Sequence, residues 1–335
     1  MTVQNKWTVA MISVVALGFA SACDEEGDVN SGTLHGEVAN DDDVDFTPVD
    51  EELTFRSIAD NGVNANGLRV NGLRVNGLRV NGLRVNGINL GVAPVSGLTI
   101  TTGSLLSAFD TGSSSTKVGA QLAGMIFDMD IEDGNNFQGA SLKIASVTQS
   151  SLQSDVYFYD LRTESSPGVW QSACTDAAGN PVEAIALRNH WDAVTAKRAK
   201  LNDAITWACR GAALAKAVEW GYRPWGTYAG VSLEDYHEAA VNMIRADYCG
   251  AGDPHTANGN SIDVSDRLGL QVNDTNWPVE AKWGPDGAVC LNTPRKTYWP
   301  RNSIPCANTL PLCTNNDPAE FGGLLMTQAV PNNIY

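Results

Sequence analysis

The chain has 335 residues, and its 38 acidic residues outnumber its 22 Lys and Arg residues, which gives a formal net charge of −16 at pH 7. A surface of this charge repels nucleic-acid phosphates and anionic lipid headgroups, so we exclude nucleic-acid binding. The sequence lacks the G-x-S-x-G, H-E-x-x-H, P-loop and G-x-G-x-x-G patterns, which lowers the expectation of familiar hydrolase, metalloprotease and nucleotide chemistry.

The N-terminus has the pattern of a bacterial export signal. Residues 1–6 carry one Lys and no acid, residues 7–19 are uncharged and mostly apolar, and the small residues 20–22 precede Cys23. The apolar run is shorter than the ~20 residues that a membrane-spanning helix needs. We therefore predict a cleaved signal peptide over residues 1–22.

The position of Cys23 directly after small residues resembles the bacterial lipobox. There the Cys thiol takes a diacylglycerol and the new amino group takes an acyl chain such as palmitate. We predict an exported lipoprotein that Cys23 anchors to a membrane of the cell envelope, at the periplasmic face of the outer membrane or at the surface, because several acyl chains hold a protein firmly. Secretion with a free Cys23 is the alternative.

Two segments of unusual composition follow the predicted anchor. Residues 24–55 are rich in Asp and Glu and contain no Lys or Arg, so we expect a disordered acidic stalk over residues 23–60. Residues 61–90 form a pentad repeat with four perfect Asn-Gly-Leu-Arg-Val units between Asn66 and Val85.

A period of five gives no apolar stripe on a helix and alternates faces on a strand, whereas Asn-Gly favours a turn. The repeat is weakly similar to pentapeptide-repeat β-helices, and we expect it either to dock on the following domain or to stay mobile. Its basic residues either contact an anionic envelope polymer or belong to a solvated linker. These are Arg69, Arg74, Arg79 and Arg84.

Residues 91–330 are predicted to form one globular α+β domain. Residues 91–170 are β-rich and predict a small antiparallel sheet or barrel, with strands near 97–101, 120–130, 140–147 and 154–161. Residues 171–330 are predicted to be helical and disulfide-rich, with helices over 202–221 and 232–250.

Six Cys residues remain once Cys23 is acylated, and export places them where disulfides persist. Fifteen connectivities are possible, and pairing of near neighbours is our first expectation. It gives Cys174–Cys209, Cys249–Cys290 and Cys306–Cys313.

A set of motifs in the second half resembles the ADYC-domain family of exported bacterial proteins. The family takes its name from the tetrapeptide Ala246-Asp-Tyr-Cys249, and the upstream Asn-Gly pentads are also typical of it. The resemblance covers roughly residues 60–330 and implies little chemistry, because no activity is established for the family. Further matching segments are residues 207–216, 220–225, 255–256, 259–263, 280–283 and 285–290.

The tetrapeptide contains the main candidate for a functional acid. Asp247 is expected to be a structural group held by Arg245, Arg223 or backbone N–H groups, and the alternative is a general acid–base pair with His255. A loop rich in oxygen ligands follows, and it either satisfies its own backbone or holds a structural Ca²⁺. Its residues are Asp253, His255, Asn258, Asn260, Asp263 and Asp266.

Two further patterns bear on function. Asp110-Thr-Gly112 copies an aspartic-protease signature, but no second copy exists, so ordinary turn chemistry is the better interpretation. Eight of the nine Trp residues lie after residue 169, and most are expected in the core. Trp225, Trp277 and Trp299 each adjoin a Pro and are the surface candidates for binding a glycan.

The sequence therefore favours a non-enzymatic envelope lipoprotein that binds a glycan or a protein, or that has a structural role. The alternative is a secreted hydrolase that uses Asp247 and His255. The predicted partners are the membrane, through the lipid anchor, and an envelope polysaccharide or protein.

Overall fold

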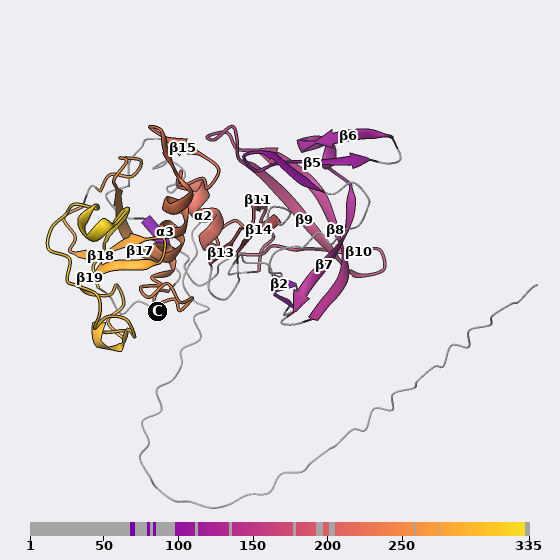
Figure 1. Cartoon of the computed structure of the whole chain (residues 1–335). Coiled ribbons are helices and arrows are strands. Elements are labelled where there is room, and N and C mark those ends of the chain that lie inside the picture. Colours follow the sequence, from indigo (N-terminus) through magenta and orange to yellow (C-terminus); the bar gives the residue numbers. More distant parts are fainter. Residues whose placement is uncertain are drawn as a thin grey trace, which may run out of the picture. The chain divides into compact units, whose positions relative to one another are not determined.

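The computed structural model describes most of the chain after residue 97 and three short strands before it (Figure 1). The predicted signal peptide at residues 1–22, the predicted lipidation site Cys23 and the predicted stalk at residues 23–60 lie outside the described residues. No helix in the described part is long and apolar enough to cross a membrane. The described residues are 68–70, 79–80, 83–84 and 98–331, without 111–112, 134–135, 177–178, 192–196, 201–204, 258 and 274.

A six-stranded antiparallel sheet forms the first half of the described chain (Figure 1). Its strand order is β14-β11-β9-β8-β7, and β10 pairs with β9. The strands are β7 (Ile126–Asp133), β8 (Asn136–Gln149), β9 (Tyr157–Ser166), β10 (Val169–Ser172), β11 (Ala184–Arg188) and β14 (Ile205–Cys209).

A three-stranded sheet, in the order β4-β5-β6, is tied to this larger sheet. Tyr159 of β9 donates its hydroxyl proton to the Ser104 carbonyl at 2.8 Å and accepts the Leu106 N–H at 2.9 Å. The same ring packs edge-on against Trp207 at 5.4 Å, inside a shared apolar core. The smaller elements are β4 (Thr99–Thr102), β5 (Leu105–Asp110), β6 (Ser115–Val118) and the 3-10 helix η1 (Gly119–Leu122).

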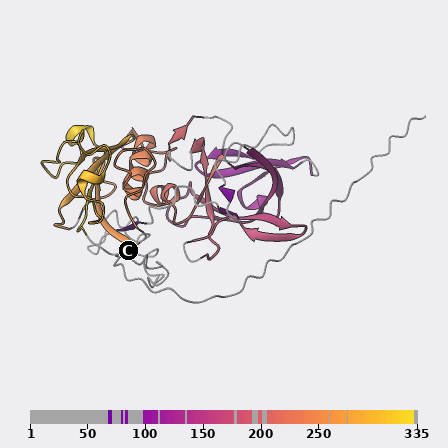
Figure 2. The same ribbon diagram turned by 90° about the horizontal axis from the view of Figure 1, so that it is seen from below.

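A second sheet, in the order β1-β17-β20-β18-β19, carries the remaining long elements. Helix α3 packs against β18, β19 and β20 and also against helix α2, as Figure 2 shows for the orange and yellow elements. The strands are β17 (Asn260–Asp266), β18 (Val279–Gly284), β19 (Gly287–Leu291) and β20 (Leu325–Gln328), and the helices are α2 (Ala213–Glu219) and α3 (Glu234–Arg245). Two hairpins and two 3-10 helices complete this half: β12 (His190–Trp191) with β13 (Arg198–Ala199), β15 (Thr227–Tyr228) with β16 (Val231–Ser232), η2 (Arg301–Ser303) and η3 (Glu320–Gly322).

The pentad repeat contributes three of the short strands. β1 (Leu68–Val70) pairs antiparallel with β17, while β2 (Arg79–Val80) pairs with β3 (Leu83–Arg84). Part of the repeat therefore docks on the following domain, which is one of the two arrangements that the sequence left open.

The predicted apolar face of α3 is confirmed, because its residues at i, i+3, i+4, i+7 and i+8 spacing are all buried. The helix ends earlier than expected. Ala246 takes the left-handed conformation (φ 51°, ψ 41°), so the helix closes four residues before Gly250. The buried face consists of Tyr236, Ala239, Ala240, Met243 and Ile244.

The other predicted helix, over residues 202–221, is wrong in its first half. Ile205–Cys209 is strand β14, which pairs with β11, and only Ala213–Glu219 is α-helical. All five residues of β14 are buried, and the Ile-Thr-Trp sequence suits a strand, so sheet packing overrides the helical spacing. The β-rich half consequently extends beyond residue 170 to Cys209.

Three disulfides join the six Cys residues after position 170. Cys174–Cys209 is the predicted pair, with a Cα–Cα distance of 5.5 Å. The other two predicted pairs are wrong, because the structure joins Cys249 to Cys306 and Cys290 to Cys313. Cys290 lies on β19, and its partner Cys313 belongs to the same C-terminal segment as Cys306. The α+β fold is confirmed, and the disulfides are typical of an exported protein.

Candidate functional site

The chain turns sharply where α3 ends, at the residue before Asp247. The Asp247 N–H donates to the Asn242 carbonyl at 2.8 Å, and the Ala246 N–H donates to the Met243 carbonyl at 3.1 Å. This is the hydrogen-bond pattern of a Schellman end, which normally places Gly at the left-handed position. Ala at position 246 costs roughly 1–2 kcal/mol in that conformation, so neighbouring contacts must offset it.

The Asp247 carboxylate lies inside the turn with no solvent exposure. Its Oδ1 accepts the Ala251 N–H at 3.1 Å, and its Oδ2 accepts the Gly252 N–H at 2.6 Å. Arg245 lies 3.6 Å from the same Oδ2 and donates to the Gly252 carbonyl at 2.5 Å. Burial raises the pKa of Asp247 above its usual range, and the two backbone N–H groups and Arg245 act in the opposite direction.

Tyr248 connects the turn to the second sheet. Its hydroxyl donates to Glu280 Oε1 at 2.6 Å, and the Arg295 Nε donates to the same oxygen at 2.7 Å. Arg295 also donates to the Met243 carbonyl at 2.9 Å, and the Tyr248 ring stacks on Trp283 at 5.3 Å. Burial, and then the Glu280 carboxylate, raise the pKa of Tyr248 well above its usual value, so its hydroxyl remains a donor.

Cys249 and Gly250 complete the turn. Cys249 forms the disulfide with Cys306, which ties the end of α3 to the C-terminal loop. Gly250 has φ 60°, and a Cβ at this position would lie 2.0 Å from the Asp286 carbonyl oxygen in the β18–β19 turn. The four residues from Asp247 to Gly250 therefore each contact a different segment, and we call this set the ADYC corner.

His255 does not combine with Asp247 into an acid–base pair. Its Nδ1 lies 3.2 Å from the Ala246 carbonyl, and its backbone N–H donates to the Arg245 carbonyl at 3.1 Å. The ring is 8% exposed and lies between Tyr248 at 5.6 Å and Trp299 at 5.3 Å. His255 therefore covers the corner, while both Asp247 oxygens accept backbone N–H groups.

The acids of the predicted calcium loop are separated in the structure. Asp253 is exposed, whereas Asp263 is buried and accepts the Thr275 N–H at 2.7 Å. Asp266 accepts the N–H groups of residues 268, 270 and 271 and the Tyr222 hydroxyl, at 2.7–3.2 Å. Asn260 lies on β17, and Asn258 lies outside the described residues. No group of three or more potential metal ligands occurs in the part of the chain that the structure describes.

The three candidate Trp residues have different surroundings. Trp225 donates its indole N–H to Asp155 Oδ2 at 2.7 Å, and Arg223 pairs with the other oxygen of that carboxylate. Trp225 therefore holds the loop between β8 and β9, which contains Asp155. Trp277 and Trp299 are both half-buried. Trp299 adjoins the half-buried Tyr298, with ring centroids 4.6 Å apart.

Asp110 of the protease-like tripeptide lies at the end of β5, where it accepts the Ser113 hydroxyl at 2.6 Å. It also lies 3.9 Å from Lys117 on the neighbouring strand. Residues 111–112 lie outside the described residues. These contacts match the turn chemistry that we expected for this tripeptide.

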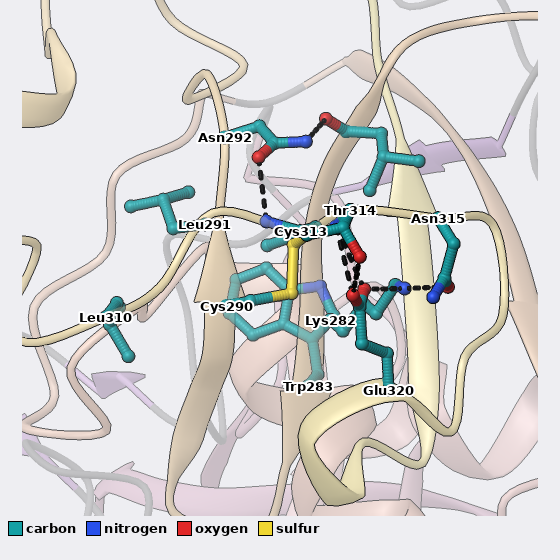
Figure 3. Close-up of a disulfide and its surroundings, with 12 residues drawn as sticks. Lys282, Trp283, Cys290, Leu291, Asn292, Leu310, Cys313, Thr314, Asn315 and Glu320 are labelled. Carbon is teal, nitrogen blue, oxygen red and sulfur yellow. Dashed lines mark hydrogen bonds and ion pairs between the residues drawn. A yellow bond between two sulfur atoms is a disulfide. The ribbon is translucent and has the colours of Figure 1, made fainter.

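A second polar cluster, which we did not predict from the sequence, surrounds the Cys290–Cys313 disulfide (Figure 3). Lys282 of β18 is completely buried, and its Nζ donates to Asn315 Oδ1 at 2.8 Å and to Glu320. Glu320 also accepts the N–H and hydroxyl of Thr314. The partners lie more than 30 residues after Lys282, and only the fold brings them together. The donors from Lys282 and Thr314 lower the pKa of Glu320 to about 2.

The packing of Gly250 against Asp286 generates the first prediction. The substitution Gly250→Ala should lower the free energy of unfolding by ~4 kcal/mol or more, because the added methyl group overlaps a carbonyl that the β18–β19 turn holds in place. Gly211→Ala is the matched control: Gly211 also has positive φ (83°), but nothing lies within 4 Å of its added Cβ, so it should lose only about 1–2 kcal/mol. Urea unfolding of the oxidised protein measures both, and equal losses would contradict the close approach.

The Glu320 contacts generate a prediction about pH. Because the folded-state pKa lies below the usual value of 4.5, the ionised group adds stability that is fully present above about pH 4.5 and is lost as the pH falls towards about 2. The substitution Glu320→Gln should therefore make unfolding less dependent on pH between 4.5 and 2. Asn315→Ala removes the neutral partner of Lys282 and should keep the dependence. Identical pH profiles for wild type and Glu320→Gln would refute the assignment.

Comparison with known proteins identifies the family of this chain but assigns no activity to it. The ADYC domain matches residues 119–297, which is more than half of the chain. No curated protein and no solved structure matches the chain. The matched region contains the end of α3, the turn after it and the Glu280–Arg295 pair, and the chain belongs to the ADYC-domain family.

Proposed function

We propose that this chain is a non-enzymatic protein of the bacterial cell envelope that binds a glycan. The observation that carries the proposal is the pairing of Asp247, whose two carboxylate oxygens accept backbone N–H groups while the side chain has no solvent exposure. A catalytic acid must reach a substrate within hydrogen-bond distance. Asp247 has no exposed surface through which a substrate could reach it, which favours a structural role.

The hydrolase alternative lacks a supporting contact. His255 Nδ1 lies against the Ala246 carbonyl, and the ring lies between two aromatic side chains. The acids of the neighbouring loop are also committed, since Asp263 and Asp266 hold backbone N–H groups. The polar groups nearest to the family motif thus stabilise the fold, and binding requires a different surface.

The pair Tyr298–Trp299 is the surface that we propose for binding. Both rings are half-exposed, their centroids lie 4.6 Å apart, and their planes meet at 56°. The His255 ring packs edge-on against Trp299, with ring centroids 5.3 Å apart, and this contact restricts the orientation of the Trp299 ring. Rigid aromatic rings with an apolar face and a polar edge suit the C–H faces of sugars. The Lys296 ammonium lies 6.0 Å from the centroid of the Tyr298 ring, and Lys296 itself is buried.

The location in the envelope is the second part of the proposal. Cys23, directly after the small residues 20–22, supports lipidation of the mature N-terminus. Three disulfides support folding outside the reducing cytosol. The acidic composition of residues 24–55 supports a spacer between the anchor and the globular domain, because like charges extend a chain.

Retention on insoluble peptidoglycan tests the binding surface. The mature protein should be retained, and Trp299→Ala should weaken retention about tenfold, since stacking on one aromatic ring contributes ~1–2 kcal/mol. Trp170→Ala is the matched control, because Trp170 is also half-exposed but Lys143 lies 5.6 Å from its ring. Equal loss in both variants, or no retention of the wild type, would contradict the proposal. Release of soluble sugar fragments by the wild type would support the hydrolase instead.

Metabolic labelling with palmitate tests the anchor. The wild-type chain expressed in a Gram-negative host should incorporate label and fractionate with membranes. Cys23→Ser should incorporate none and should appear in the soluble envelope fraction, because no acyl acceptor remains at the predicted cleavage site. If the wild-type protein incorporates no palmitate but still fractionates with membranes, an element other than Cys23 holds it there.

A further inference from the structure

Strand β17 is the outermost long strand on one side of the second sheet, and only the short strand β1 of the repeat lies beyond it. Its inner side pairs with β20, and its outer side pairs with β1 over three residues. The opposing Cα partners are Leu68 with Ile262, Arg69 with Ser261 and Val70 with Asn260. An exposed strand edge presents unpaired N–H and C=O groups, which an extended peptide satisfies through its backbone.

The strand that occupies this edge is one of four copies of the same sequence. Leu-Arg-Val recurs after Asn-Gly at residues 68–70, 73–75, 78–80 and 83–85. If another copy occupied the edge, the three opposing pairs would be the same. The backbone pairing that holds β1 therefore contains nothing that distinguishes the first copy from the others.

The residues of β17 add no contact that is specific for one copy. Asn260, opposite Val70, is 3% exposed, and neither polar atom of its amide has a hydrogen-bond partner among the described residues. A side-chain hydrogen bond from Asn260 thus does not fix the register. The repeat also pairs as a strand elsewhere, since Arg79 and Val80 lie opposite Arg84 and Leu83. The repeat sequence is therefore able to form strands at more than one unit.

We propose that the outer edge of β17 is a peptide-binding site for the chain's own Asn-Gly-Leu-Arg-Val repeat, and that it accepts each of the four units in turn. The ligand class is an extended peptide with Leu opposite Ile262 and Arg opposite Ser261. Binding within one chain is favoured, because the tethered units are present at millimolar effective concentration. The site is independent of the glycan surface proposed above.

Exchange among the units would change the length of chain before the docked strand. Leu83 lies 15 residues after Leu68, and the intermediate units give steps of five residues. Fifteen extended residues span up to ~50 Å. The same domain would thus be held at four discrete distances from its N-terminal segment, without a change in its own fold.

Disulfide trapping in the intact mature chain tests the proposal. Cys23→Ser removes the odd thiol, and Ser261→Cys is combined in turn with Arg69→Cys, Arg74→Cys, Arg79→Cys and Arg84→Cys. Under mild oxidation all four pairs should form cross-links within one chain, with yields that agree within about threefold. Val289→Cys on β19, the opposite edge strand, replaces Ser261→Cys as the control and should give less than a tenth of that yield.

Three results would overturn the proposal. Cross-linking of Arg69→Cys alone would show that the site is specific for the first unit. Cross-linked dimers in place of monomers would show that the units bind to another chain. No cross-link with Ser261→Cys would show that the β17 edge does not take up the repeat.

Deletion provides a second measurement without added thiols. Removing residues 66–70 leaves three identical units, so a non-discriminating site should keep the unfolding midpoint in urea unchanged. Removing residues 66–85 leaves no perfect unit and should lower it. A lower midpoint after the first deletion, equal to that after the second, would overturn the proposal.

Discussion

The second half of this protein depends on a carboxylate that is buried at the end of a helix. The Asp247 carboxyl group has no contact with water, so its oxygens need hydrogen-bond donors from the protein, and the N–H groups of Ala251 and Gly252 supply them. This requirement fixes the direction in which the chain leaves α3. Once that direction is set, Tyr248 faces Glu280, Cys249 faces Cys306, and Gly250 lies against the β18–β19 turn. The residues Asp247 to Gly250, three of which belong to the family tetrapeptide, therefore form a corner that joins four segments.

Buried charge pairs of this kind add little to the net free energy of folding, but they favour one arrangement of the chain over others. Glu280 and Arg295 are both fully buried, and removing either partner would leave a charge without compensation, although an apolar pair of the same volume would cost little. Lys282 and Glu320 act in the same way near the Cys290–Cys313 disulfide, where they fasten the C-terminal loop onto β18 (Figure 3). The described part of the domain has short helices and many loops, so it gains a unique structure from such contacts. The disulfides restrict the alternatives in the unfolded chain.

The sequence predicted those features that depend on local spacing. The buried face of α3 follows from its helical periodicity, and a structural role for Asp247 was expected from its place in the last helical turn. Features that depend on the fold were not accessible. Ile205–Cys209 became a strand because β11 offered a partner, and the cysteines after residue 240 paired across elements that no spacing rule brings together. The partners of Lys282 were missed for the same reason, since Asn315 and Glu320 come from a distant loop.

Native-state hydrogen exchange of the Ala251 and Gly252 amides tests the central claim most directly. If Asp247 holds the corner, both amides should exchange only through large-scale unfolding, with protection similar to that of buried amides in α3, and Asp247→Asn should accelerate both. Exchange as rapid as that of an exposed turn, such as Ala229-Gly230, would contradict the account.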